Sequence, residues 1–124
     1  MSTAFDKGLA MRKKVMGEEF VAKAFANATE FTQPMQQYIT QNAWGDVWQR
    51  EGLDLKTRSL ITVAMLTALG KQHELKGHVR GALNNGATVQ EIQEVLLHAS
   101  IYCGVPTAVE AFRSAAEVVD APKP

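Results

Sequence analysis

The sequence has one cysteine, four prolines, few aromatic residues (7%) and no excess of either charge. Because Cys103 has no second cysteine to pair with, the chain cannot form an internal disulfide, and we expect a reducing, cytoplasmic location. Thirteen Lys and Arg residues balance thirteen Asp and Glu residues, so the chain lacks the basic excess typical of proteins that bind nucleic acid backbones. The apolar run at residues 59–70 is well short of the about 20 residues that a membrane-spanning helix needs. The charged N-terminal residues also lack the pattern of a secretory signal.

The composition that remains is that of an ordinary globular domain. The chain has 124 residues, of which 46% are hydrophobic and 21% are charged, and this fits one domain with a substantial core. We expect a single domain over residues 1–124, with an ordered helical core at about 5–119 and a frayed tail at 120–124. Convincing strand alternation is lacking, so the sequence predicts an all-α bundle of about six to seven helices.

Helix start and stop signals divide the chain into segments. Gly17 and Gly86 stand where helices end, because glycine readily adopts the left-handed C-terminal conformation. Thr88 and Glu91 have the spacing of a capping box at a helix start. Pro34 predicts either a first helical turn or a kink. The expected helices cover residues 3–15, 18–28, 29–48, 55–69, 72–84, 89–103 and 105–119.

The segment 55–69 is apolar on nearly all sides. A helix of this kind must be buried over most of its surface, and one domain of this size has little room for it. We therefore predict that a partner subunit covers this helix together with its own domain. The alternative is a central helix in a monomeric bundle.

Glu74 and His78 lie four residues apart on the expected fifth helix, so their side chains share one face with Gly81 and Asn85. Gly77 and Gly81 each cost about 1 kcal/mol relative to alanine inside a helix, which indicates that another backbone or a small ligand packs close to them. Two interpretations are open for Glu74 and His78. They are an acid/base pair on a pocket wall, or an ion pair on the surface.

Arg58, Ser59 and Thr62 form the polar stripe of the otherwise apolar segment 55–69. An arginine in a buried helix needs a counter-charge, which is either a carboxylate of the protein or an anionic substrate. The planar guanidinium suits carboxylates in both cases.

Three further features have two interpretations each. Trp44 and Trp48 are four residues apart and should stack, as core packing or as the aromatic wall of a pocket. His98 follows Glu94 by four residues, as a solvated helix pair or as part of a site. Cys103 lies on an apolar stripe, where we expect a buried, inert thiol rather than a reactive one.

Several motifs are lacking: C-x-x-C, G-x-S-x-G, a glycine-rich phosphate loop and H-E-x-x-H. The three histidines, at 73, 78 and 98, do not have the spacing of metal ligands, so we expect no metal. The residues alone thus indicate a cytoplasmic, oligomeric all-α domain with a candidate Glu/His/Arg site, and they do not specify a reaction.

Five motifs occur in order along the chain: WGDVW at 44–48, RSLITVAML at 58–66, ELKGHVR at 74–80, NNG at 84–86 and IYCGVP at 101–106. With these motifs the sequence closely resembles the carboxymuconolactone decarboxylase family from about Phe5 to Val119. The resemblance implies the helical fold of alkylhydroperoxidase-D-like proteins and an assembly of three or six subunits.

The same fold also serves thiol-dependent peroxidases, which carry a C-x-x-C motif shortly before a histidine. When that histidine is matched to His78, the cysteine positions fall on Lys71 and Glu74. Because the thiol pair is missing, disulfide-based peroxide chemistry is disfavoured. A non-catalytic helical interaction module remains the third alternative.

The decarboxylase branch implies a small anionic lactone substrate, a butenolide with a ring carboxylate and a carboxymethyl arm. Loss of carbon dioxide leaves an electron pair that delocalises to the lactone carbonyl, and the ring carbon beside that carbonyl is then protonated. The product is 3-oxoadipate enol-lactone, in protocatechuate catabolism. Because the substrate is its own electron sink, we expect no cofactor.

This chemistry needs a cation for the retained carboxylate, a donor to the lactone oxygen, an acid for the carbon and a pocket of low polarity. We expect His78 to be the proton or oxyanion donor and Glu74 to orient it. The remaining expected substrate contacts are Arg58 and Arg80 for the anionic groups, and Trp44, Trp48 and Tyr102 for the pocket wall.

Overall fold

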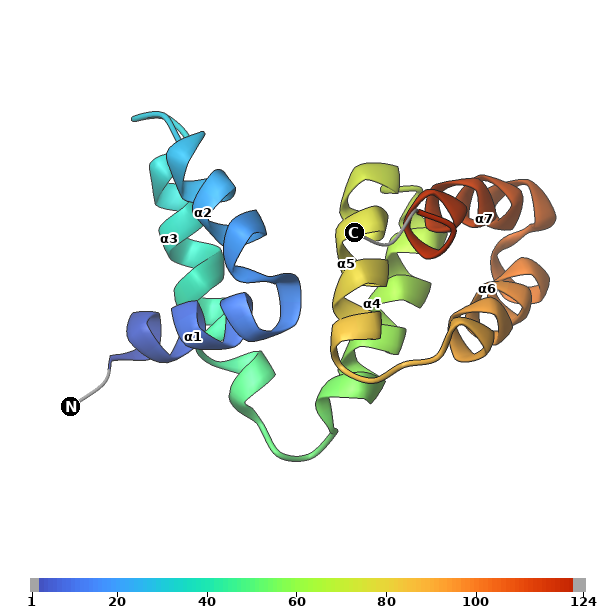
Figure 1. The fold of residues 1–124 in the computed structure, drawn as a ribbon, viewed down its shortest axis with the longest axis horizontal. Helices are drawn as coiled ribbons and strands as arrows, with labels where there is room; N and C mark the ends of the chain where they lie inside the picture. The colour runs from blue at the N-terminus through green and yellow to red at the C-terminus, as the bar shows by residue number, and fades with distance from the viewer. Residues whose placement is uncertain (1–2, 122–124) are drawn as a thin grey trace. The chain divides into compact units, whose positions relative to one another are not determined.

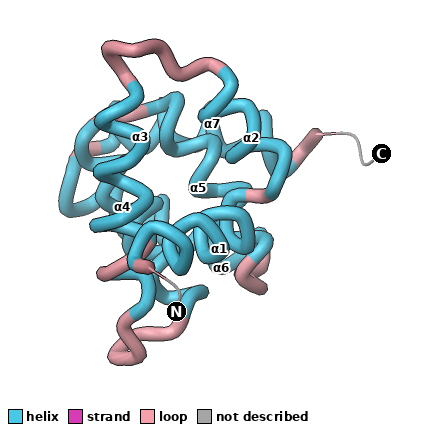
Figure 2. Tube along the Cα trace, turned by 90° about the vertical axis from the view of Figure 1, so that its left-hand side faces the viewer, coloured by secondary structure: helices cyan, strands magenta, loops and turns pink. Residues whose placement is uncertain are grey.

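The computed structural model describes residues 3–121, and within that range it contains helices and turns but no strand (Figures 1 and 2). The all-α prediction is therefore confirmed. Of the frayed tail expected at 120–124, residues 122–124 lie outside the described residues. The elements are α1 (Ala4–Met16), α2 (Glu18–Ala26), α3 (Gln33–Ile39), the π-helical turn η1 (Thr40–Trp44), the 3₁₀ turn η2 (Val47–Gln49), α4 (Leu55–Leu69), α5 (Gln72–Asn84), α6 (Val89–Cys103) and α7 (Val105–Val119).

The predicted capping box at the start of α6 is confirmed. The Thr88 hydroxyl accepts a hydrogen bond from the Glu91 backbone N–H at 3.0 Å, and the Glu91 carboxylate accepts one from the Thr88 N–H at 2.9 Å. Both bonds satisfy donors that the first turn of a helix leaves unpaired. Gly86 has a φ of 91°, a left-handed value that suits the end of α5.

The chain forms two compact units, Met1–Asp54 and Leu55–Pro124. In the first unit, α1 packs against α2 and η1. Gly8 allows the closest approach, because a Cβ atom there would collide with the carbonyl oxygen of Thr40. Arg12 is buried beside this contact and donates hydrogen bonds to Gln36 Oε1 at 2.9 Å and Thr40 Oγ1 at 3.2 Å. Burial of the Arg12 guanidinium lowers its pKa.

The single helix expected at 29–48 is wrong. The helix α3 ends at Ile39 and the chain continues as a π-helical turn, a short turn and η2. The change begins at Thr40, whose hydroxyl donates to the Gln36 carbonyl at 2.7 Å and accepts from Arg12. These tertiary contacts, together with the backbone of α1 against η1, override the local helical pattern. Pro34 lies in the first turn of α3, one of its two predicted positions.

In the second unit, α5 packs against α4 and α7, and α6 packs against α4 and α7 (Figure 1). The apolar sides of the four helices meet in one core. Its fully buried members come from all four helices, so each helix contributes to the stability of the others. They include Val63, Leu75, Val79, Ala82, Ile92, Leu96, Ala111 and Ala115.

Helix α4 is buried on one side and exposed on another. Ser59, Val63 and Thr67 are buried, whereas Met65 and Leu69 are 58% and 68% exposed. The described residues thus leave one apolar side of α4 uncovered, and the expected cover by a partner subunit stays a prediction. No helix within residues 3–121 has the length and hydrophobicity to cross a membrane.

Candidate active site

Asn85, directly after α5, joins this helix to α4 and lies on the same stripe as Glu74, His78 and Gly81. At the end of that stripe, the Asn85 amide donates to Ser59 Oγ at 2.9 Å and to the Leu55 carbonyl at 3.3 Å. Gly81 on the same stripe is buried, His78 is half-buried and Glu74 is exposed. Burial along this stripe thus increases from Glu74 through His78 to Gly81.

The Nδ1 atom of His78 is buried, while the residue as a whole is half-buried. Its role as proton donor and the orienting role of the exposed Glu74 stay predictions.

The two predicted substrate-binding arginines lie in different surroundings. Arg58 is in the first turns of α4, half-buried, with a buried Nε atom. The Thr62 hydroxyl donates to the Arg58 carbonyl at 2.8 Å. Arg80 on α5 is exposed. Arg58 is therefore the more buried of the two cations, and Arg80 is the more exposed.

The predicted tryptophan stack is formed in the first unit. The rings of Trp44 and Trp48 have centroids 4.7 Å apart and planes 24° apart, and both residues are buried. The Gln49 amide donates to the Trp44 carbonyl at 3.0 Å and to the Lys7 carbonyl at 3.1 Å, which holds η2 against α1. The stack is part of the packing of its unit, and its expected role as a pocket wall stays a prediction.

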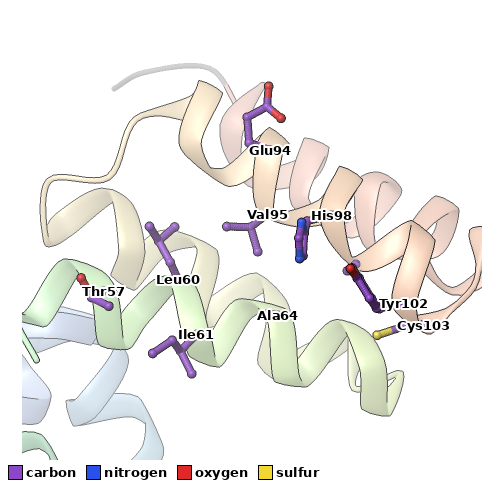
Figure 3. Close-up of a pocket in the computed structure, with 10 residues that line it drawn as sticks. Thr57, Leu60, Ile61, Ala64, Glu94, Val95, His98, Tyr102 and Cys103 are labelled. Atoms are coloured by element: carbon purple, nitrogen blue, oxygen red, sulfur yellow. The ribbon is translucent and has the colours of Figure 1, made fainter.

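A hollow of about 530 Å³ lies between α4 and α6 (Figure 3). Its walls are almost entirely apolar, and the residues that line it include no Lys or Arg. Two carboxylates of a substrate would find no cation there, so the hollow does not fit the expected substrate. The lining residues are Thr57, Leu60, Ile61, Ala64, Glu94, Val95, His98, Ala99, Tyr102 and Cys103.

The α6 side of this hollow corrects one prediction. Cys103 is exposed, so the expectation of a buried thiol is wrong: it is the last residue of α6, at the rim of the hollow. The rings of His98 and Tyr102 lie at a tilt, with centroids 5.0 Å apart and planes 34° apart, and Glu94 points away from His98 (Figure 3). Tyr102 is 78% exposed, and its contact with substrate stays a prediction.

Sequence reasoning missed two features of this region. The first is the hydrogen bonding of Asn85 to α4, because the Asn-Gly pair at 85–86 indicated no more than the end of a helix. The second is the α4/α6 hollow, because a hollow depends on how two helices pack. The position of Asn85 on the stripe of His78 was the one available signal for the first.

Comparison with known proteins covers most of the chain. Residues 33–117 match the model of the Carboxymuconolactone decarboxylase family. A nitrosuccinic acid decarboxylase of Metarhizium robertsii is 52% identical over 107 residues, which are 86% of this chain and 75% of that protein. A 4-carboxymuconolactone decarboxylase of Acinetobacter baylyi is 44% identical over 114 residues, covering 92% of this chain and 85% of the relative. An uncharacterized 15.0 kDa protein of Paracoccus denitrificans is 39% identical over 77 residues, 60% of this chain and 58% of its own.

Proposed function

The chain belongs to the carboxymuconolactone decarboxylase family and is a carboxy-lyase of that family, and we propose that it removes carbon dioxide from 4-carboxymuconolactone in the cytoplasm, in protocatechuate catabolism. One observation carries the choice of site. The half-buried Arg58 on α4 and the half-buried His78 on α5 belong to two helices that the Asn85 amide joins. An anion-binding group and a proton donor on adjoining helices are what this decarboxylation requires.

The reaction breaks the bond between the ring carbon and its carboxylate. The electron pair of that bond passes through the ring double bond to the lactone carbonyl, and carbon dioxide leaves. The resulting dienolate takes a proton on the ring carbon beside the carbonyl, which gives 3-oxoadipate enol-lactone. Charge develops on the lactone oxygen during the first step, so a hydrogen-bond donor at that oxygen stabilises the transition state.

Each candidate residue then has one role. Arg58 binds the carboxylate that is retained, because a planar guanidinium matches a carboxylate in two hydrogen bonds. His78 donates a hydrogen bond to the lactone oxygen or a proton to carbon, and Glu74 orients it. Arg80, being exposed, attracts the second anionic group of the incoming substrate. Trp44, Trp48 and Tyr102 keep their predicted role as surfaces of low polarity.

A second substrate has its own support, because the Metarhizium relative is a nitrosuccinic acid decarboxylase and more than half of the matched positions are identical. Nitrosuccinic acid is a dicarboxylic acid whose nitro group takes up the electron pair that carbon dioxide leaves. The same cation and donor would serve either acid. What would change is the shape of the pocket around the electron acceptor.

We propose further that the protein is a homo-oligomer, a trimer or a hexamer. The exposed apolar side chains of α4, among them Ile61, Met65 and Leu69, support this because a partner copy would remove them from water. Size-exclusion chromatography with light scattering tests it. A mass of 13.6 kDa, that of one chain, would contradict the proposal.

The proposed activity is tested by incubating the purified protein with 4-carboxymuconolactone and, in parallel, with nitrosuccinic acid. We expect release of carbon dioxide and a change in ultraviolet absorbance with the lactone, and a higher kcat/KM for it than for nitrosuccinic acid. A higher kcat/KM for nitrosuccinic acid would favour the second substrate. Turnover of neither acid would reject both.

A further inference from the structure

We infer that Asn85 is a positioning residue for the decarboxylation: its side-chain amide fixes where Arg58 on α4 lies relative to His78 on α5. The inference rests on the proposed function. Asn85 does not touch substrate in this account, and it acts through the two helices that carry the substrate-binding and proton-donating groups.

The Asn85 amide bonds to residues on both sides of Arg58 in the sequence. Asn85 Nδ2 donates to the carbonyl of Leu55, three residues before Arg58, and to the hydroxyl of Ser59, the residue after it. Ser59 is fully buried, so its hydroxyl has no water to replace the amide. Two bonds from one planar amide to one helical turn restrict both the rotation and the sliding of α4 against α5.

His78 precedes Asn85 by seven residues and lies on the same stripe. Seven residues are about two helical turns, or roughly 10 Å of rigid helix. Because α5 is rigid between His78 and Asn85, the hydrogen bonds of the Asn85 amide also fix the first turn of α4 relative to the imidazole of His78. A displacement of about 1 Å between reacting groups can cost about 100-fold in rate, so this constraint matters for catalysis.

The side chain of Asn85 is not needed to end α5. Its backbone N–H already bonds to the carbonyl of Gly81 at 3.0 Å, and the left-handed Gly86 turns the chain. A residue that served only as a helix end would leave its amide to solvent. Here the amide instead donates its hydrogen bonds to the neighbouring helix α4, next to Arg58, the residue that we expect to bind the substrate carboxylate.

The test compares kcat and KM of Asn85→Ala with those of the wild type on 4-carboxymuconolactone. Arg58 still binds the carboxylate in the variant, whereas the imidazole is displaced from the reacting carbon. We therefore expect kcat to fall by about 10- to 100-fold and KM to change by less than about threefold. A kcat within about threefold of the wild type, in a folded variant, overturns the inference.

Ser59→Ala is the second variant, because it removes one hydroxyl and leaves the amide and the rest of the core in place. We expect a fall in kcat of about 3- to 10-fold, smaller than for Asn85→Ala because the bond to the Leu55 carbonyl remains. Should Asn85→Ala fail to fold, an unchanged kcat for Ser59→Ala overturns the inference by itself.

Ser114→Ala is the matched control. The buried Ser114 hydroxyl donates to Gln72 Oε1 at 2.5 Å and joins α7 to the start of α5, away from Arg58. We expect a loss of Tm similar to that of Ser59→Ala with kcat within about twofold of the wild type. An equal fall of kcat in both variants would reduce the role of Asn85 to general stability.

A double variant separates positioning from stability further. If Asn85 acts by placing His78, adding Asn85→Ala to His78→Gln lowers kcat by less than about twofold, because the group to be placed is already gone. Multiplicative losses would contradict the inference. A wild-type protein that does not turn over either acid is a different result, since it rejects the proposed function and not the position of Asn85.

Discussion

Different kinds of contact stabilise the two units, one within residues 3–54 and the other within residues 55–121. In the first range, α1 meets η1 through the backbone at Gly8, and the buried Arg12 bonds to neutral oxygen atoms. In the second range, four helices pack through large apolar side chains such as Leu75 and Leu96. The first unit should therefore be sensitive to atoms that are added, and the second to atoms that are removed.

The two units also differ in the chemistry they offer. The first contributes a buried aromatic stack, Trp44 and Trp48, which packs in its own unit. The second contributes Arg58 and His78, each partly buried on adjoining helices. The difference predicts that substitutions which affect turnover without affecting folding will be found in the second unit.

The largest effect is expected for His78→Gln. Loss of a general acid or oxyanion donor lowers rates by about 10²- to 10⁴-fold, so we expect kcat to fall by about 1,000-fold while Tm changes little. The control is His73→Gln, an exposed histidine on the same helix, which should keep wild-type kcat. An equal loss in His98→Gln would instead move the chemistry to the α4/α6 hollow.

Leu75→Ala should cause the largest loss of stability in the second unit. Leu75 is fully buried at the centre of the four-helix core, and removing such a side chain leaves a cavity. We expect the free energy of unfolding to fall by about 3 kcal/mol in urea titrations. Leu97→Ala, at a leucine that is 47% exposed, is the comparison. A loss as large for Leu97 as for Leu75 would mean that a partner buries α6.

Gly8→Ala tests the opposite sensitivity of the first unit. The added Cβ would overlap backbone atoms of Thr40 and Gly45, which cannot rotate away. We expect a loss of about 2 kcal/mol, net of the small gain that alanine gives inside a helix. Gly52→Ala is the control, because no atom lies within 4 Å of a Cβ at Gly52. Similar Tm values for the two variants would show that the α1–η1 contact does not stabilise the fold.

Features set by local signals could be predicted from the sequence, whereas features set by tertiary contacts could not. The ends of α4 and α5 lie at Gly70 and before Gly86, both with positive φ, and the bounds of both helices match the predicted ranges. The third predicted helix failed because the contacts of Thr40 with Arg12 and α1 are tertiary and leave no periodic signal. Cys103 was misplaced for a related reason: helical spacing assigned it to the apolar stripe, but the stripe leaves the core before the last turn of α6.

For the candidate site, spacing alone predicted which residues share a face of α5, and the burial of Gly81 agrees with the close packing expected there. The roles of Arg58 and His78 came from the family resemblance and the needs of the reaction. Spacing within a helix says nothing about which neighbouring helix that face meets. The hydrogen bonds of Asn85 to Ser59 and Leu55 supply that information.

The smallest effect is expected for Glu91→Gln at the start of α6. The hydrogen bond from the Thr88 backbone N–H and then the ion pair with Lys56, at 3.1 Å, lower the pKa of the Glu91 carboxyl. A carboxyl whose pKa is lower in the folded than in the unfolded state stabilises the fold above its unfolded pKa, and this stabilisation is lost as pH falls through the folded pKa. Glutamine can still accept the capping bond, so only the contribution of the charge is removed.

We therefore expect the urea midpoint of Glu91→Gln to lie slightly below that of the wild type at neutral pH and to coincide with it in strong acid. Because Glu91 and Lys56 are both solvent-accessible, the difference at neutral pH should also shrink as salt is added. Glu94→Gln, an exposed carboxylate near the start of the same helix, is the control and should keep the wild-type urea midpoint at neutral pH. A gap between Glu91→Gln and the wild type that persists in strong acid would mean that the carboxylate stabilises α6 by its shape and not by its charge.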